Sequence, residues 1–207
     1  MARMKGIVGI EAAIVLIAFV LVASALAFIA INMGMFATQK SKEVMGKAYE
    51  ASTKALDIAG DAIAHVSSTS EGLVDRIYIP IKLTAGSSPI DLTRVSITIV
   101  TTLNGTSVGK AKTLSFNGIS DITDYSSITN SGWYYAYKVK DNTLLEPGEV
   151  VVLVINNTEF TSGSNTYYWK AYDTIQVEIK PPEGAPVMVR YTVPPTLTSE
   201  FVDLVIG

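Results

Sequence analysis

The feature that most constrains this chain of 207 residues is a long uncharged stretch near its N-terminus. A short leader with two basic residues, Arg3 and Lys5, is followed by apolar residues from Ile7 onward, and only Glu11 carries a charge before Lys40. A helix needs about 20 apolar residues to cross the hydrocarbon core of a bilayer, so this stretch is long enough to span one. A helix that is apolar on every side must be buried in lipid or among other helices. The N-terminus therefore predicts a segment that is embedded in a membrane, in a bundle of helices, or in each of them in turn.

The helical pattern continues beyond Lys40, where it becomes amphipathic. Apolar residues recur at steps of three or four, which is the period of an α-helix, and charged residues take most of the other positions. No proline occurs before Pro80, so no proline breaks the helix earlier. We predict one helix over residues 7–66, about 90 Å long at 1.5 Å per residue, ended by the polar residues 67–70. The apolar residues of its second half are Val44, Ala48, Ala51, Ala55, Ile58, Ala62 and Val66.

The apolar stretch is also compatible with two alternative roles, whereas a third, the buried core helix of a soluble domain, is disfavoured because the stretch is too long and too uniform. A single-pass membrane anchor would have the same length. A secretory signal peptide is the second alternative, because residues 23–25 (Ala-Ser-Ala) fit the small-residue cleavage pattern. However, the apolar core of a signal peptide is only about 7–15 residues long, whereas here the apolar run continues well past residue 25 and contains Glu11.

The composition changes after Ser70, where Thr, Val, Ile, Tyr and Ser dominate. These residues form strands and turns, and turn signals such as Asn104-Gly105 separate several short strands. The predicted fold class is α+β: a long N-terminal hydrophobic α-helix followed by an antiparallel β-sandwich or barrel, immunoglobulin-like, as a head domain over residues 67–207. The predicted strands are 73–84, 93–103, 108–116, 133–140, 150–156, 167–180 and 185–193.

The residue types needed for catalysis are scarce. There is no Cys, and the one His, His65, lies near the predicted end of the helix, where a surface or packing role is expected. A G-x-S-x-G match at residues 105–109 begins in a predicted hairpin turn, and not between a strand and a helix as a nucleophile elbow requires. The chain lacks a phosphate-binding loop motif, and its net charge of −3 argues against a nucleic-acid partner. We therefore expect no enzyme activity, no cofactor and no metal.

Two weaker alternatives involve the head domain. Asp121, Asp124 and Asp141 lie in loop-like sequence, but their spacing does not match the EF-hand pattern for calcium. Aromatic clusters at residues 133–137 and 167–169 are typical of strand packing, although a glycan-binding face on a membrane-anchored module would have the same composition.

Two sequons make N-glycosylation a further expectation. They are Asn104-Gly105-Thr106 and Asn156-Asn157-Thr158, and both lie at predicted turns or strand ends. The predicted acceptors are therefore Asn104 and Asn156, which would make the protein a glycoprotein.

Particular residues of the chain resemble those of type IV pilins. The resemblance lies in the basic leader ending in Lys5-Gly6, the apolar helix that starts at Ile7, and Glu11 at the fifth position after Gly6. Within that superfamily the chain is similar to the archaeal flagellins, or archaellins, through residues 9–23 and through the C-terminal run 179–186, followed by Arg190 and residues 192–195. The resemblance is strong in the helix and moderate in the C-terminal strands, and residues 85–170 match no motif.

The resemblance implies a structural subunit of the archaeal flagellum (archaellum) filament, used for swimming; the alternative is an archaeal type IV-like adhesion pilus. It implies that a prepilin-type peptidase removes residues 1–6, a class III signal peptide, between Gly6 and Ile7. The helix would wait in the membrane with Arg3 and Lys5 on the cytoplasmic side. A separate assembly ATPase and a membrane platform protein would then build an extracellular homopolymer.

The apolar helix is expected to form the contacts between subunits, and the head domain to lie outside them. A fragment that begins near Ser67 should be monomeric. Glu11 is expected to pair with the new α-amino group of Ile7 on its own or a neighbouring chain, or else to be solvated at the membrane interface before assembly. The residues assigned to assembly are Glu11, Ile14, Leu16, Phe19, Leu21, Leu26 and Phe28.

The leader predicts one processing event. Gly6 has no side chain and can enter a narrow protease site in extended form, so cleavage should occur between Gly6 and Ile7. Mass spectrometry of the mature protein should show Ile7 as its first residue. Mature protein that begins at Met1, Leu26 or Phe28 would contradict this expectation.

Overall fold

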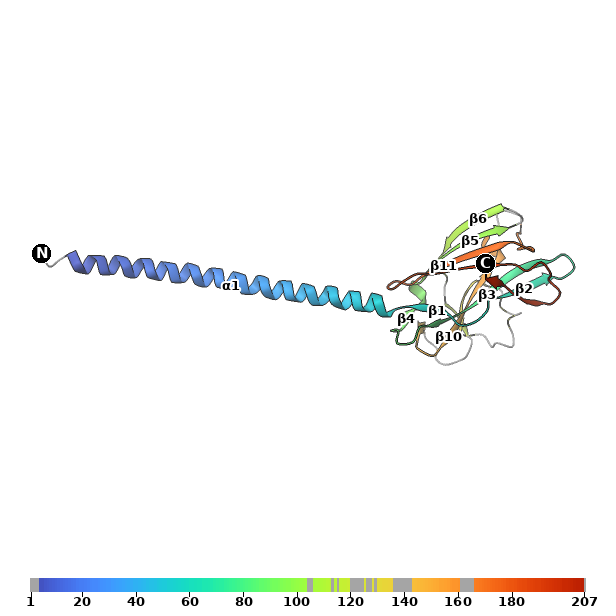
Figure 1. Cartoon of the computed structure of the whole chain (residues 1–207), viewed down its shortest axis with the longest axis horizontal. Helices are drawn as coiled ribbons and strands as arrows, with labels where there is room; N and C mark the ends of the chain where they lie inside the picture. The colour runs from blue at the N-terminus through green and yellow to red at the C-terminus, as the bar shows by residue number, and fades with distance from the viewer. Residues whose placement is uncertain are drawn as a thin grey trace. The chain divides into compact units, whose positions relative to one another are not determined.

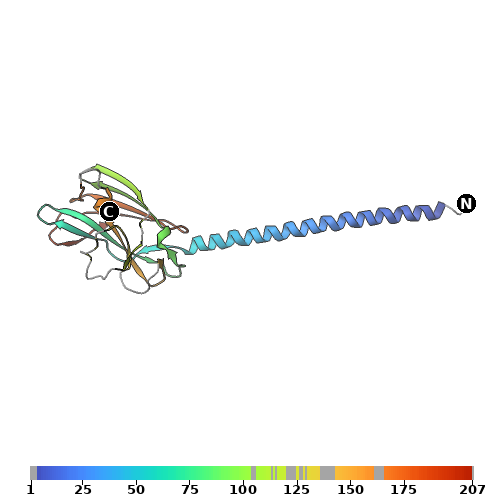
Figure 2. The same cartoon turned by 180° about the vertical axis from the view of Figure 1, so that it is seen from behind.

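The computed structural model describes residues 4–103, 106–112, 114, 116–119, 125, 128, 130–135, 143–160 and 166–206, with residues 4–8, 103, 106–112 and 116–119 described by their backbone alone. The chain divides into two compact units, Met1–Tyr49 and Glu50–Gly207. The first is helical and the second consists mostly of strands, as Figure 1 and, from behind, Figure 2 show. This arrangement is the predicted α+β fold class.

The helix α1 runs without interruption over Met4–Thr53. The two hydroxyl groups of its uncharged part are satisfied inside the helix, because Ser24 Oγ donates to the Val20 carbonyl (2.6 Å) and Thr38 Oγ1 to the Gly34 carbonyl (2.8 Å). Such bonds to the preceding turn let Ser and Thr lie in an apolar environment without water. Mean hydropathy reaches 3.1 in α1, which is long and apolar enough to cross a membrane by length and composition.

The helix ends earlier than predicted, and the assignment of residues 54–66 to it is wrong. These residues contain β1 (Leu56–Ile58) and most of β2 (Ile63–Ser68), and both strands pair antiparallel with β3 (Leu73–Leu83). Small and apolar residues are compatible with strands as well as with a helix, so this local pattern does not decide between the two. The 11-residue β3 offers backbone partners along its length, with Leu56 opposite Leu83 and Ile63 opposite Tyr78. A fragment that begins at Ser67 would therefore remove β1 and most of β2 from the head.

The strands of the head form two main sheets and one small one among the described residues. The larger sheet has the order β13-β2-β3-β10-β8-β7, with β1 also on β3, and the second has the order β14-β12-β11-β5-β6. All pairs are antiparallel except β7 with β8. The remaining bounds are β4 (Ile90–Asp91), β5 (Ser96–Leu103), β6 (Thr106–Lys112), β7 (Phe116–Ile119), β8 (Gly132–Tyr135), β9 (Leu144–Leu145), β10 (Val150–Asn156), β11 (Thr174–Lys180), β12 (Val187–Thr192), β13 (Phe201–Asp203) and β14 (Val205–Ile206).

The prediction of strands was best where the apolar pattern was longest. Strand β10 has the predicted bounds, and β3 ends one residue before the predicted 84. Strand β11 begins only at Thr174, because residues 170–173 form a turn, and the part of the predicted strand 133–140 beyond Tyr135 lies outside the described residues. The short strands β4, β9, β13 and β14 were missed, as were β1, β2 and β7.

The core lies between the inner faces of the two main sheets. Ile77, Ile79 and Ile81 of β3 and Ile175 and Val177 of β11 are essentially inaccessible to solvent and belong to one apolar cluster. Burying each such side chain contributes roughly 1.5–3 kcal/mol relative to leaving it exposed. This core is the main source of stability for the head.

A second, smaller cluster covers the other face of the larger sheet. Val152 and Val154 of β10 pack there with Tyr78 and Ile128. The Tyr78 hydroxyl donates to the Tyr125 carbonyl at 2.7 Å, and burial raises the pKa of Tyr78 to about 12, so this phenol stays a donor. Strand β10 is therefore buried on both faces, which explains why its sequence is an unbroken apolar run.

The turn between β11 and β12 contacts the residue that follows α1. Lys54 forms an ion pair with Glu183, and Gly184 lies directly against the Lys54 backbone. Gly184 has φ +111°, and a Cβ placed on it would lie only 1.9 Å from the Lys54 carbonyl oxygen. A residue without a side chain is required at this position.

Substitution at Gly184 should therefore destabilise the head more than substitution at a glycine that has a positive φ but no neighbouring atom in the way of a Cβ. Gly184→Ala should lose about 3–4 kcal/mol of unfolding free energy, because the Lys54 backbone has to move. The matched control is Gly86→Ala: Gly86 also has a positive φ (+83°), but a Cβ there meets no atom within 4 Å, so its loss should be about 1–2 kcal/mol.

The measurement is urea unfolding of the detergent-solubilised chain, followed by the fluorescence of Trp133 and Trp169, which both lie in the head. Equal losses in the two variants would show that the contact with Lys54 contributes nothing.

Candidate functional site

The surface of α1 is the largest candidate site. Every side chain from Gly9 to Ser52 is exposed to solvent in the single chain. The six apolar residues assigned to assembly each expose more than 60% of their surface: Ile14, Leu16, Phe19, Leu21, Leu26 and Phe28. Each gains roughly 1.5–3 kcal/mol when buried, so the helix has a strong tendency to leave water.

The apolar character of α1 extends around its whole circumference. Val15, Ile17, Val20 and Val22 are also exposed, and together with Leu16 they occupy successive angular positions around the axis. A helix that packs against one partner needs only a stripe, whereas a helix that is apolar all round needs partners, or lipid, on every side. The surface of α1 is therefore suited to a bilayer and to the centre of a bundle.

Glu11 is the one charged group in this apolar part. It borders a shallow depression lined by Ala12, Val15, Leu16 and Phe19. Within the described part of the chain its carboxylate has no hydrogen bond or ion pair. The backbone of Gly6 and Ile7 lies in the first turn of α1. Burial of Glu11 in a bundle without a cation would cost several kcal/mol, so the proposed partner, the α-amino group of Ile7, would have to come close to it.

The character of the helix surface changes at Lys40. Lys40 and Lys47 both lie 2.8 Å from Glu43, at spacings of three and four residues. These exposed pairs keep the second half of α1 polar on one side. The uncharged apolar surface of α1 therefore ends between Ala37 and Lys40.

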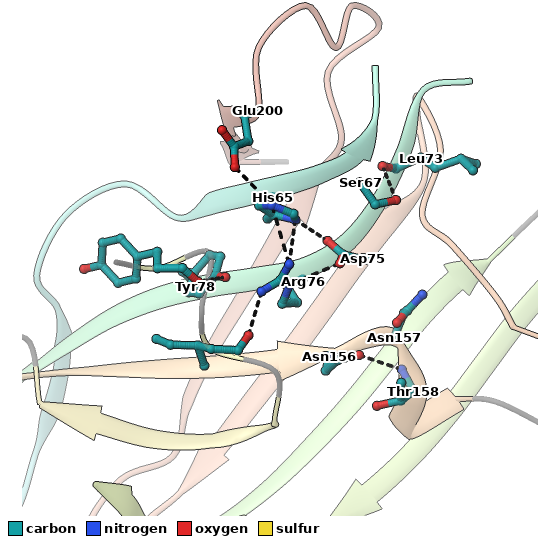
Figure 3. A network of polar contacts seen from close by, with 12 residues as sticks. His65, Ser67, Leu73, Asp75, Arg76, Tyr78, Asn156, Asn157, Thr158 and Glu200 are labelled. Carbon is teal, nitrogen blue, oxygen red and sulfur yellow. Dashed lines mark hydrogen bonds and ion pairs between the residues drawn. The ribbon is translucent and has the colours of Figure 1, made fainter. Parts of the chain in front are cut away.

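His65 lies in a cluster of charged residues in the head, so its predicted place at a helix end is wrong, whereas the predicted packing role agrees with its burial. In Figure 3 its ring points toward two carboxylates: Nδ1 lies 2.5 Å from Asp75 Oδ1, and Nε2 lies 3.6 Å from Glu200 Oε1. The ring also packs against Phe201, with 5.2 Å between centroids. His65 therefore fastens β13 to β2 and β3.

Arg76, the cross-strand neighbour of His65, completes this cluster. Its Nε lies 3.1 Å from Asp75 Oδ2 (Figure 3), and its Nη1 donates to the Ile128 carbonyl at 2.7 Å. Its side chain is almost fully buried, and a buried guanidinium needs such partners. The cluster joins β2, β3, β13 and residue 128, which is a structural role.

The predicted glycosylation acceptors differ in what the structure describes. Asn104 lies outside the described residues. Asn156 ends β10 and is only 7% exposed, with its side-chain oxygen accepting a hydrogen bond from the Thr158 amide at 2.9 Å. Its neighbour Asn157 donates to the Tyr167 carbonyl at 2.6 Å. Because Asn156 is buried, a glycan would have to be added to it before this region folds. N-glycosylation of Asn156 stays a prediction.

Three rings of the aromatic clusters pack in the core. Trp133, Tyr135 and Trp169 are inaccessible or nearly so, and Trp169 Nε1 donates to Thr101 Oγ1 at 2.6 Å. This burial excludes these three rings from a glycan-binding face. Asp121, Asp124 and Asp141 lie outside the described residues. Among the residues that the structure describes, no three His, Asp or Glu side chains are grouped to hold a metal ion.

Two features of the head were missed by sequence reasoning. The contact of Gly184 with Lys54 joins residues far apart in the chain, so no local pattern reports it. Tyr172 has a positive φ of 68° in a turn without Gly or Asn, the residues that usually signal such a backbone.

Known proteins are similar to this chain in sequence and in fold. Residues 6–191 match the model of the archaeal-type flagellin family. Probable flagellin 1 of Aeropyrum pernix is 42% identical over 95% of this chain and 96% of its own length, and probable flagellin 2 of Archaeoglobus fulgidus is 33% identical over 94% and 92%.

Solved structures show the same fold. The archaeal flagellum of Methanospirillum hungatei matches with a TM-score of 0.65 and 26% identity, over 96% of this chain and 99% of that chain. The crystal structure of an archaeal flagellin from Methanocaldococcus jannaschii matches with a TM-score of 0.56 and 21% identity, over 73% and 96%.

The exposed position of Glu11 yields a prediction about assembly. Glu11→Gln keeps the size of the side chain and removes its charge, so an ion pair with the α-amino group of Ile7 would be lost and that amino group left unpaired in the bundle. Cells that produce this variant should carry fewer and shorter filaments, counted by electron microscopy. Glu43→Gln is the control, because Glu43 lies outside the apolar surface, and it should assemble normally. Normal filament number and length for Glu11→Gln would rule out the pairing.

Proposed function

The chain belongs to the archaeal-type flagellin family, and from this premise we propose how it works as the structural subunit of an archaeal flagellum. The subunit polymerises through α1 into a filament on the cell surface that serves swimming. The single observation that carries this mechanism is the fully exposed apolar surface of α1, which has to be buried in lipid or among other helices.

The same surface is suited to the subunit both before assembly, in the membrane, and after assembly, in the filament. Before assembly, the uncharged part of α1 lies in the membrane, where its apolar side chains contact lipid, with Arg3 and Lys5 on the cytoplasmic side. A prepilin-type peptidase removes residues 1–6. Assembly then moves α1 from lipid into a bundle of identical helices. Since both environments are apolar, the transfer itself releases little hydrophobic free energy.

Energy for assembly has to come from outside this chain, whose sequence lacks a phosphate-binding loop motif. We assign this work to a separate ATPase at a membrane platform protein. The chain itself has a structural role and no catalytic one.

The filament is held by heterologous contacts. Copies related by an open screw operation use two different surfaces for each contact, which continues the polymer instead of closing a ring. The β domain lies outside the helical bundle and faces the medium. The names of the relatives favour the flagellum over an adhesion pilus.

A deletion strain tests the function directly. Cells without this gene should lose swimming in soft agar, and the intact gene should restore it. The matched variant is Phe19→Asp, which places a second charge in the bundle and should not restore motility. Swimming by the deletion strain, with loss of surface attachment instead, would assign the chain to an adhesion pilus.

The role of α1 predicts that the head alone does not polymerise. A fragment of residues 50–207 retains β1 and β2 but lacks the apolar surface, so it should be a folded monomer. Sedimentation velocity should give a single species of monomer mass, and circular dichroism should give a strand-dominated spectrum. Filaments of this fragment would mean that contacts between heads hold the polymer together.

A further inference from the structure

Lys42 is an exposed cation of α1 that has no partner in its own helix. Within the described part of the chain its ammonium group forms no hydrogen bond or ion pair. The positions three and four residues away from it carry no acidic group: Thr38, Gln39, Met45 and Gly46. Side chains on a helix meet at these spacings, so α1 itself cannot supply a counter-charge for Lys42.

Glu50 is an exposed carboxylate in the same half of α1, and it also has no ion pair among the described residues. Lys47, three residues before it, lies 2.8 Å from Glu43, which Lys40 also contacts at 2.8 Å. At about 100° per residue, these four side chains occupy an arc of about 80°, and Lys42 lies about 80° beyond its edge. The second half of α1 therefore presents an unpaired cation and an unpaired anion on two different faces.

The face of α1 around Lys42 is otherwise uncharged. Met35, Met45 and Tyr49 on this side of the helix expose 59%, 69% and 71% of their surface. Lys42 borders a shallow groove of about 470 Å³, whose other lining residues are Ile31, Gly34, Met35, Thr38 and Gln39. A neighbour that covers this face also removes the ammonium group from water, which is favourable only when the neighbour brings a counter-charge.

We infer that Lys42 of one subunit forms an ion pair with Glu50 of a neighbouring copy in the filament. The inference rests on the proposed function, because the filament brings identical helices together. The two charges lie on different faces of one helix, as a heterologous contact requires. Copies related by a screw operation run in the same direction, so the pair staggers neighbouring helices by about 12 Å, the rise of eight residues.

This stagger preserves most of the apolar contact between the helices. The uncharged run of residues 12–39 is about 42 Å long at 1.5 Å per residue, so a shift of about 12 Å leaves about 30 Å of it against the same run of the neighbour. Pairing of Lys42 with Glu11, 31 residues away, would need a shift of about 46 Å, longer than the run itself. Because apolar burial supplies most of the cohesion, it favours Glu50 over Glu11 as the partner.

Cross-linking of intact filaments with a water-soluble carbodiimide tests the pair, because this reagent joins an amine directly to a carboxylate without a spacer. The filaments are then dissociated, and peptides from the dimer band of a denaturing gel are analysed by mass spectrometry. A Lys42–Glu50 link should be present in the dimer, and the yield of dimer should fall in filaments of Lys42→Gln. Links of Glu43 with Lys40 and Lys47 are the internal controls, since both pairs already lie 2.8 Å apart.

Filaments that show the control links without a Lys42–Glu50 link would overturn the inference. A link of Lys42 with Glu11, or an unchanged yield of dimer in Lys42→Gln, would do the same. Absence of the unaltered chain from filaments would contradict the proposed function instead.

Charge reversal gives an independent readout. Lys42→Glu and Glu50→Lys should each lower the temperature at which filaments dissociate, because like charges then face each other between subunits. The double variant restores opposite charges and should recover most of the loss, and Lys42→Arg, which keeps the charge, should behave as the parent. A double variant whose filaments dissociate at the same temperature as those of the weaker single variant would show that the two residues do not meet.

Discussion

The structure depends on one constraint: the apolar side chains around α1 have to be kept out of water on every side. A single head domain cannot meet this demand, because a surface that is apolar around the whole circumference needs neighbours all round. Lipid meets it before assembly in the proposed mechanism, and identical helices meet it afterwards. The in-helix hydrogen bonds of Ser24 and Thr38 fit both environments, because neither hydroxyl requires water.

The head obtains its stability in a different way. Its core is closed between two sheets, and β3 is the strand on which the larger sheet depends, since β1, β2 and β10 all pair with it. The charged cluster of His65, Asp75, Arg76 and Glu200 then holds the outer strand β13 and residue 128 against this sheet. Because the two units differ in this way, the head can be stable as a single copy while α1 cannot.

The long apolar helix, its polar second half, the family resemblance and the class of the head could be predicted from the residues alone. These features are local: charge, hydropathy and alternation are visible in a short window, and β10 was predicted within its bounds because its apolar run is continuous. The tertiary structure alone decided where the helix ends. Residues 56–58 and 63–66 fit a helix or a strand by local pattern, and their hydrogen bonds with β3 selected the strand. It also decided the partners of His65, the burial of Asn156 and the contact of Gly184 with Lys54, because each depends on residues that are distant in the sequence or on packing that no local pattern encodes.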